Sequence, residues 1–406
     1  MSAPDGAASV SDAVPRRFAA GNALRAIAAM SVLVFHAAIA TLLWNNAKAV
    51  TGEGTPTQFK PIFGPLAAEF VNMRSGIYIF FALSGYLLTR TFLAAYLLGT
   101  PYPSIARYAR NRALRIIPAF WVVTTVYAVW DRFEGGAEGL ATVYLFVQNY
   151  HPTPAINVMG QAWTLDLEVA FYIVIPLASL LSMWAGRRLR TTPGQRLAIV
   201  LAVLAAAYAL SLQFKHDIGN PITLTYNIAD YLFAFIPGVA LAAIEPFAAP
   251  RLRSSSSGRV WSWALLALCV VLLGVFISLP VSDYGLRLIF VTLGCGAMLA
   301  APLTLQWGTS GCWRVLDNRV MNWLGERSYG IYLIHLGLMT HVLARVGHGH
   351  GVKTTFALML VGVTVATLVG ADLLWRFVEH PALQRRLPWR QAEFGRAAAA
   401  TGAGKS

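Results

Sequence analysis

Long apolar stretches separated by short polar segments dominate the chain. The first runs from Asn22 to Trp44, and nine more follow at about 76–98, 116–130, 167–184, 197–214, 230–247, 260–279, 286–307, 328–345 and 354–375. A helix needs about 20 apolar residues to cross a bilayer. The pattern therefore predicts an all-α fold, a polytopic membrane helix bundle with ten transmembrane spans.

The segments outside these stretches complete the predicted organisation. Residues 1–17 and 390–406 are rich in small and polar residues, which predicts a disordered tail at each end of a membrane domain at 18–389. The apolar stretch 140–148 is too short to span and is expected to be interfacial or re-entrant. The first stretch resembles a signal peptide, but its apolar run continues beyond Ala40, so we expect it to be retained as a span.

Charge is scarce and unevenly distributed. Only 12% of the 406 residues are charged, and the formal net charge is +14. With ten spans, 24 of the 32 lysines and arginines fall on the side of the termini, which the positive-inside rule assigns to the cytoplasm. We therefore predict that both termini are cytoplasmic and that the protein is a multi-pass protein of the cytoplasmic (inner) membrane. The net charge then reflects topology and lipid contact, and no nucleic-acid partner is expected.

Two ionisable residues interrupt the first apolar stretch. Arg25 and His36 are eleven residues apart, which is about three helical turns, so both side chains share a face about 16 Å apart along the axis. Ionisable groups at membrane depth are costly and by default mark a functional path. The alternative is an arginine that reaches the interface and a histidine satisfied by a neighbour in the core.

Arginines gather before the third span. The segment from Arg107 to Trp121 contains Arg110, Arg112 and Arg115. The planar guanidinium group can donate two parallel hydrogen bonds to a phosphate. The cluster predicts a site for a phosphorylated donor, and the alternative is a topological signal that keeps this segment in the cytoplasm.

Further candidates lie in other spans. Glu168 follows a helix start and faces the bundle, where a carboxylate can orient a histidine base. Ser84 and Tyr86 lie in the second span, Trp163 precedes Glu168, and His335 is a second histidine in an apolar stretch. Close helix packing is the alternative for Ser84, and a structural role is the alternative for His335. The cysteines fit no metal-ligand spacing, and no metal is expected. A metal site at His341, His348 and His350 is the less favoured alternative, because no acidic or cysteine residue is near them in the sequence.

These motifs, in this order, resemble the membrane-bound acyltransferase 3 family. The segments that carry the resemblance are Leu24 to His36, Gly76 to Tyr86, Arg110 to Trp121, Trp163 to Glu168, Ser328 to His335, and Phe377 to Pro381. The resemblance implies a ten-helix fold that moves an acyl group from cytoplasmic acyl-CoA to a hydroxyl, often of a sugar. Family members modify surface polysaccharides, peptidoglycan and macrolides.

The chain departs from the family pattern in places. Tyr78 stands where an acidic residue is common, Thr164 replaces a serine, and His380 replaces an arginine. A carboxylate role is therefore not carried over to Tyr78, nor a charge to His380. The soluble domain that follows the membrane domain in some members is absent from this sequence, so we interpret the chain as the membrane module alone.

The sequence thus predicts a membrane O-acyltransferase with acyl-CoA, in particular acetyl-CoA, as the donor. Its acceptor is a hydroxyl of a glycan, glycolipid or macrolide. The CoA phosphates are expected on Arg25, Arg110, Arg112 and Arg115. His36 takes the acceptor proton, while Glu168 orients His36 or contacts the acceptor. Ser84, Tyr86, Trp163 and His335 are expected to line the substrate path. The alternative is a secondary transporter, although its usual inverted repeats are not evident.

Overall fold

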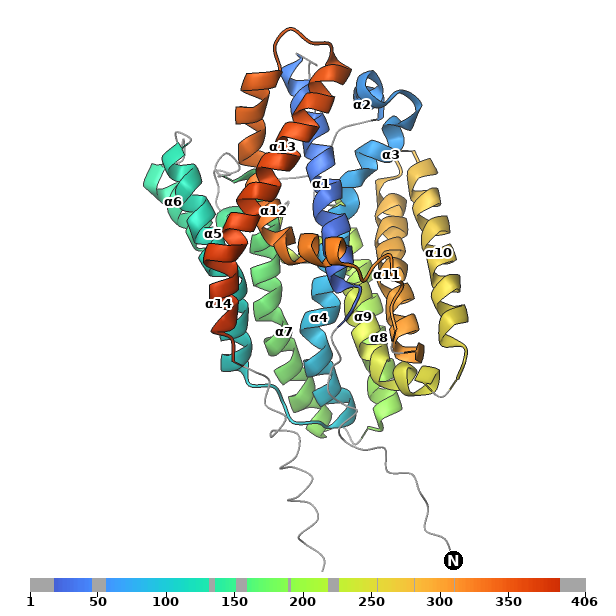
Figure 1. Cartoon of the computed structure of the whole chain (residues 1–406). Coiled ribbons are helices and arrows are strands. Elements are labelled where there is room, and N and C mark those ends of the chain that lie inside the picture. The colour runs from blue at the N-terminus through green and yellow to red at the C-terminus, as the bar shows by residue number, and fades with distance from the viewer. Residues whose placement is uncertain are drawn as a thin grey trace, which may run out of the picture.

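The computed structural model describes residues 18–45, 56–130, 136–150, 159–188, 191–217, 226–253, 255–280, 282–309 and 311–387. The tails predicted at 1–17 and 390–406 lie outside the described residues. Within the described ranges the regular elements are helices, and no strand occurs among them. The protein is therefore an α-helical bundle, as the sequence predicts (Figure 1).

Ten long helices in the described ranges form the bundle. They are α1 (Gly21–Trp44), α4 (Gly76–Leu98), α5 (Ile105–Trp130), α7 (Trp163–Arg188), α8 (Pro193–Asp217), α9 (Ile228–Arg253), α10 (Gly258–Ser278), α11 (Tyr284–Thr309), α12 (Arg319–Val346) and α13 (Val352–Leu374). In the described part of the chain, nine helical segments are long and apolar enough to cross a membrane. The remaining long helix, α12, has 28 residues but a more polar sequence. The protein is a multi-pass membrane protein, and the count of ten spans stays a prediction.

Short helices connect the long ones. The first long connection contains α2 (Pro56–Phe63), η2 (Gly64–Leu66), α3 (Ala67–Val71) and η3 (Asn72–Ser75). The stretch predicted as interfacial or re-entrant begins in α6 (Gly136–Tyr144), which is followed by η4 (Gln148–Tyr150) and, closer to α7, by η6 (Gly160–Ala162). After α13 come η8 (Trp375–Glu379), a π-helical turn, and α14 (His380–Gln384).

The third predicted span is longer than expected. The apolar run suggested 116–130, preceded by a loop, but α5 begins at Ile105 and contains every arginine from Arg107 to Arg115. Arginine is a good helix former, so the polar segment continues the apolar helix without a break. The arginines therefore project from a helix rather than from a flexible loop.

Helix α1 lies at the centre of the bundle and contacts α4, α12 and α13 (Figure 1). Small side chains allow close approach between membrane helices, and α1 buries many alanines, among them Ala28, Ala29 and Ala37. Gly76, the first residue of α4, packs against α1 so tightly that a Cβ there would collide with Ser31 and with the carbonyl of Ala28. The candidate residues on α1 are thereby held against α4 and α12.

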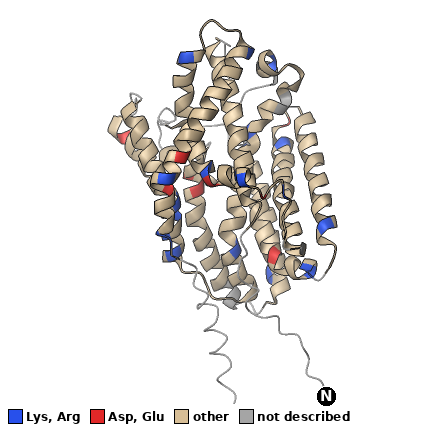
Figure 2. Ribbon diagram, viewed as in Figure 1, with Lys and Arg blue, Asp and Glu red and all other residues tan. Residues whose placement is uncertain are grey.

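Basic residues gather in the lower half of the bundle as it is drawn in Figure 2. This half includes the arginine-rich start of α5 and the C-terminal end of α9, which carries Arg251 and Arg253. The distribution is the one that the positive-inside rule expects of a cytoplasmic face. The orientation of the termini stays a prediction.

Candidate functional site

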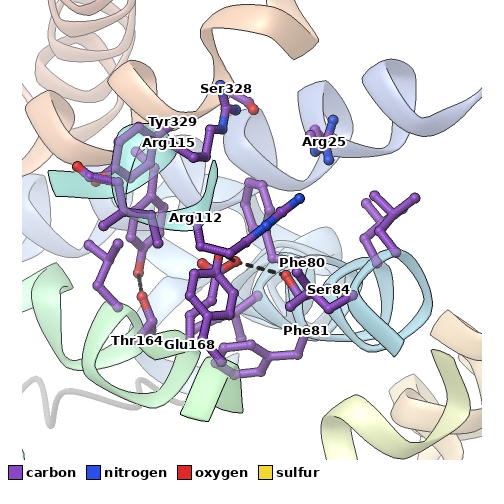
Figure 3. A pocket seen from close by; sticks show the side chains of 18 residues that line it. Arg25, Phe80, Phe81, Ser84, Arg112, Arg115, Thr164, Glu168, Ser328 and Tyr329 are labelled. Carbon is purple, nitrogen blue, oxygen red and sulfur yellow. Dashed lines mark hydrogen bonds between the residues drawn. The ribbon is translucent and has the colours of Figure 1, made fainter. Parts of the chain in front are cut away.

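A cavity of about 100 Å³ lies between α1, α4, α5, α7 and α12. We call it the inner cavity. Its polar lining includes Arg25 from α1, Ser84 from α4, Arg112 and Arg115 from α5, and Glu168 from α7. Figure 3 shows these side chains around one space, with Ser84 and Glu168 joined by a hydrogen bond. Five predicted site residues from four helices therefore meet here.

Glu168 is held firmly on one side of the inner cavity. The Ser84 hydroxyl donates to Glu168 Oε1 over 3.0 Å, and the Tyr172 hydroxyl donates to the same oxygen over 2.7 Å. Tyr172 lies one turn further along α7, so its hydroxyl reaches Glu168 on the same helix face. The carboxylate thus presents a fixed negative charge and hydrogen-bond acceptor to the cavity.

The arginines of the inner cavity differ in their partners. Arg115 Nη1 lies 3.3 Å from Glu379 Oε2, and the Glu379 side chain is only 1% exposed. Arg112 lies with its Cζ 6.0 Å from the centre of the Tyr172 ring, and its buried Nε has no hydrogen-bond partner among the described residues. Arg25 forms no hydrogen bond or ion pair with the rest of the described chain. Guanidinium donors are therefore available to an anionic ligand.

A further arginine, Arg386, lies near Arg115 and Arg112 without lining the inner cavity, and it was not predicted from the sequence. Burial and the nearby guanidinium groups of Arg115 and Arg112 lower the pKa of Arg386 to about 10. Its buried Nε lacks a hydrogen-bond partner within the described ranges. In the sequence, Arg386 is recognisable only as a basic residue shortly after the Phe377–Pro381 motif. The sequence does not show that the segment after this motif packs against the start of α5.

Arg110 does not join the cluster. It is exposed, does not line the inner cavity, and donates from Nη2 to the carbonyl of Arg385 over 3.3 Å. Positions 110, 112 and 115 cannot all face one side, because successive residues turn by about 100° around a helix. The structure thus separates Arg110 from the predicted set and leaves Arg25, Arg112 and Arg115 together.

A second cavity, of about 180 Å³, contains His36. We call it the outer cavity. Much of its wall is aromatic, including Trp163, Tyr226 and Tyr231, and it also includes two arginines, Arg74 and Arg287. Trp163, predicted on the substrate path, therefore lies in the same cavity as the predicted base.

His36 is paired with His335. Nε2 of His335 lies 3.1 Å from Nδ1 of His36, while Nδ1 of His335 lies 2.7 Å from the carbonyl oxygen of Tyr332. A carbonyl oxygen only accepts, so Nδ1 of His335 carries a proton. In the neutral pair, Nε2 of His335 then accepts from Nδ1–H of His36, which leaves a lone pair on Nε2 of His36. In this tautomer, Nε2 of His36 can accept a proton.

The two cavities meet at Ile77 and Tyr332, because both residues line both cavities. The Tyr332 hydroxyl lies 2.8 Å from Thr164 Oγ1 and donates to the carbonyl of Gln161 over 3.1 Å. The outer cavity contacts the beginning of α7, whereas the inner cavity contacts its next turns. Arg25, Arg112 and Arg115 thus line the inner cavity and His36 lines the outer one, whereas His335, which was predicted on the substrate path, lines neither of them.

The predicted pairing of Glu168 with His36 is not the one seen. Glu168 bonds to Ser84 and Tyr172, whereas His36 bonds to His335. The sequence prediction placed Glu168 near the start of α7. The first residue of α7, Trp163, lines the same cavity as His36. Glu168 lies five residues after Trp163, which is about 7.5 Å further along the helix axis, and it lines the inner cavity instead.

Tyr86 does not line either cavity described here, contrary to the predicted path. It is 1% exposed and packs in the core, with its ring centre 5.9 Å from that of Phe18. The Arg90 guanidinium lies 5.1 Å from the centre of its ring. Tyr86 is two residues after Ser84, and residues two apart on a helix do not share a face.

No group of three or more histidine, cysteine, aspartate or glutamate side chains in the described ranges could hold a metal ion. The inner cavity offers an ionic site built from the guanidinium groups of Arg25, Arg112 and Arg115 and the carboxylate of Glu168. The outer cavity offers a histidine with a free lone pair among aromatic side chains.

Comparison with known proteins identifies a family and several relatives that match most of the helical region. Residues 19–376 match the acyltransferase 3 family model, which is described as an acyltransferase domain. Peptidoglycan O-acetyltransferase OatA of Listeria monocytogenes is 27% identical over 331 residues, which cover 75% of this chain and 50% of that protein. Exopolysaccharide production protein ExoZ of Rhizobium meliloti is 28% identical over 326 residues, which cover 78% of this chain and 92% of that protein.

A Bacillus subtilis relative, YrhL, is 26% identical over 329 residues, which again cover 75% of this chain and 50% of the relative. The chain thus spans about half the length of the Listeria and Bacillus relatives it matches. No solved structure matches the chain.

Proposed function

This chain belongs to the acyltransferase 3 family, and we propose that it is an O-acyltransferase of the cytoplasmic membrane that transfers an acetyl group from acetyl-CoA to a hydroxyl of a glycan. The observation that carries the proposal is the meeting of two unlike cavities at Ile77 and Tyr332. The inner cavity has guanidinium groups that suit a phosphorylated donor. The outer cavity has a histidine that can act as the base for a hydroxyl acceptor. Relatives named for peptidoglycan and exopolysaccharide support a glycan as the acceptor.

In the proposed donor site, Arg25, Arg112 and Arg115 bind the phosphates of CoA at the cytoplasmic end of the path. Charge-assisted bonds from guanidinium to phosphate are short and strong, and they fix the donor geometrically. Glu168 accepts hydrogen bonds from Ser84 and Tyr172. Its second oxygen can accept from an amide N–H of the pantetheine arm, which extends past Ile77 toward the outer cavity.

In the proposed transfer step, the oxygen of the acceptor hydroxyl attacks the carbonyl carbon of the thioester. At the same time, Nε2 of His36 removes the proton of that hydroxyl. The new C–O bond forms, the C–S bond breaks, and the CoA thiolate leaves and receives the proton from His36. His335 holds the His36 ring in the required tautomer throughout. A base positioned in this way contributes about 10²–10⁴-fold to the rate.

The proposal is tested with the purified protein in lipid vesicles, labelled acetyl-CoA and oligosaccharide fragments of bacterial cell-surface polysaccharides. We expect acceptor-dependent release of free CoA together with label on the glycan. Accumulation of a solute inside the vesicles, with no acetyl turnover for any acceptor, would instead support the transporter hypothesis. The relatives give no support to that alternative.

His335 is expected to act as a positioning residue. Leucine in its place removes the acceptor for Nδ1–H of His36, so kcat should fall at least about tenfold while KM for acetyl-CoA stays within about twofold. Glutamine can still accept through its amide oxygen, so His335→Gln should retain more activity than His335→Leu. Turnover is measured at matched protein levels across a pH series. Equal kcat for wild type and His335→Leu, or a loss confined to KM, would refute the positioning role.

A further inference from the structure

We propose that the outer cavity binds the acceptor by stacking one face of a pyranose ring on Trp163, Tyr226 and Tyr231, and that it selects sugars whose stacked face carries no axial hydroxyl. The inference rests on the proposed function and specifies its acceptor. It is carried by the arrangement of the three rings, by the polar groups of the same cavity, and by the contacts that hold the rings in place.

The three rings form one continuous aromatic wall. The Trp163 ring centre lies 4.7 Å from that of Tyr226 and 5.0 Å from that of Tyr231, and the two tyrosine rings are nearly parallel, with an interplanar angle of 12°. All three residues line the outer cavity together with His36. Aromatic faces are large, apolar and electron-rich, so they attract the weakly positive hydrogens of C–H groups. A ligand beside His36 therefore meets a broad surface of this kind rather than an isolated ring.

A pyranose matches this cavity because it is amphipathic. Its ring presents C–H groups on both faces, whereas its equatorial hydroxyls project around the rim. The outer cavity has the same division, since His36 and Arg287 add polar groups beside the aromatic wall. An axial hydroxyl on the stacked face would be pressed against an aromatic ring, and a polar group that is buried without a hydrogen-bond partner is costly. The wall therefore discriminates between sugars that differ only in the orientation of one hydroxyl.

Asn149 holds two parts of the wall together. Its side-chain amide donates to the carbonyl of Trp163 over 2.8 Å and to the carbonyl of Tyr226 over 2.9 Å. Its backbone N–H donates to Asp166 Oδ2 over 3.1 Å, and Asp166 is only 1% exposed. One amide group thus fixes two segments that are distant in the sequence. A surface that is ordered before the ligand arrives loses less entropy on binding.

Lys215 supports the tyrosines of the wall. Its Nζ lies 4.4 Å from the centre of the Tyr231 ring and 5.8 Å from that of Tyr226, and it lies 3.9 Å from Asp230 Oδ2. A cation is attracted to an aromatic face. Lys215 does not line the outer cavity, so it restrains the tyrosine rings without occupying the space for the sugar.

The test compares methyl glycosides that differ at one carbon. Methyl β-glucoside has equatorial hydroxyls, methyl β-galactoside has an axial hydroxyl at C4, and methyl β-alloside has an axial hydroxyl at C3 on the opposite face. Binding is measured from the concentration dependence of the melting temperature, in a detergent without a sugar headgroup, and needs no turnover. We expect methyl β-glucoside to bind at least about fivefold tighter than one of the two epimers. The epimer that binds more weakly identifies the stacked face.

Variants locate the effect. Trp163→Leu keeps an apolar side chain but removes the aromatic face, so the preference should fall below about twofold, whereas Trp163→Phe should keep most of it. The control is Trp261→Leu, which changes an exposed tryptophan of α10 that does not line the outer cavity. This control should bind the three glycosides as the wild type does.

Equal binding of the three glycosides, no stabilisation by any of them, or an unchanged preference in Trp163→Leu would overturn the inference. Acetyl-CoA turnover with an oligosaccharide acceptor in that case would leave the proposed function intact. Conversely, the expected preference in a protein that turns over no acetyl-CoA would support the sugar site and count against the proposed reaction.

Discussion

Replacing His36 by glutamine is expected to reduce acetyl transfer by about 10²–10⁴-fold, the contribution usual for a positioned general base. Glutamine keeps a polar side chain of similar length, but it cannot take up the acceptor proton. Its amide can still donate to Nε2 of His335, so the contact between α1 and α12 is retained. The measurement is turnover of labelled acetyl-CoA at matched levels of folded protein. KM for the donor should change little, because His36 lies in the outer cavity.

A second histidine of α12 provides the control. His341 lies six residues beyond His335, donates from Nδ1–H to the Gly337 carbonyl over 3.0 Å, and lines neither the inner nor the outer cavity. His341→Gln should keep turnover within about twofold of wild type. If His36→Gln retains more than about a tenth of the wild-type rate, the proton goes to another group. His335 and Glu168 would then be examined as the base.

Local spacing in the sequence was enough to predict the arrangement along α1. Arg25 and His36 are separated by about three turns, and the structure places them in two cavities that share Ile77 and Tyr332. The helical fold follows from long apolar stretches for the same reason, because hydrophobic length is a local property. The grouping of Arg112 with Arg115 likewise needs only the periodicity of one helix.

Contacts between distant segments were not predictable in the same way. His36 and His335 are 299 residues apart, and no local pattern indicates that two histidines on different helices meet. The depth of Glu168 depended on where α7 begins relative to α1, which is set by the loops and by helix packing. Arg386 was missed because the return of the chain after α14 to the start of α5 is a tertiary contact. These features were decided by packing between helices rather than by local sequence.

Neutralising Arg112 and Arg115 together is expected to reduce the affinity for acetyl-CoA more than neutralising either arginine alone. Arg115 is the partner of Glu379, whose side chain is 1% exposed, and removing one member of a buried ion pair costs about 3–5 kcal/mol of stability. The glutamine substitutions are therefore made in a Glu379→Gln background, which leaves no buried carboxylate unpaired, and the variant and its Glu379→Gln reference are assayed at matched levels of folded protein. This design separates the loss of a ligand contact from the loss of a folded protein.

In that background, Arg112→Gln with Arg115→Gln should raise KM for acetyl-CoA at least tenfold. Each charged hydrogen bond to phosphate is worth about 1.5–3 kcal/mol, and about 1.4 kcal/mol is a factor of ten. Arg110→Gln is the matched control, since Arg110 is an exposed arginine on the same helix whose guanidinium contacts the Arg385 carbonyl outside the cavity. Its KM should stay within about twofold. If the double variant binds acetyl-CoA as tightly as its reference and only its orientation in the membrane is disturbed, the cluster is a topological signal and the donor enters elsewhere.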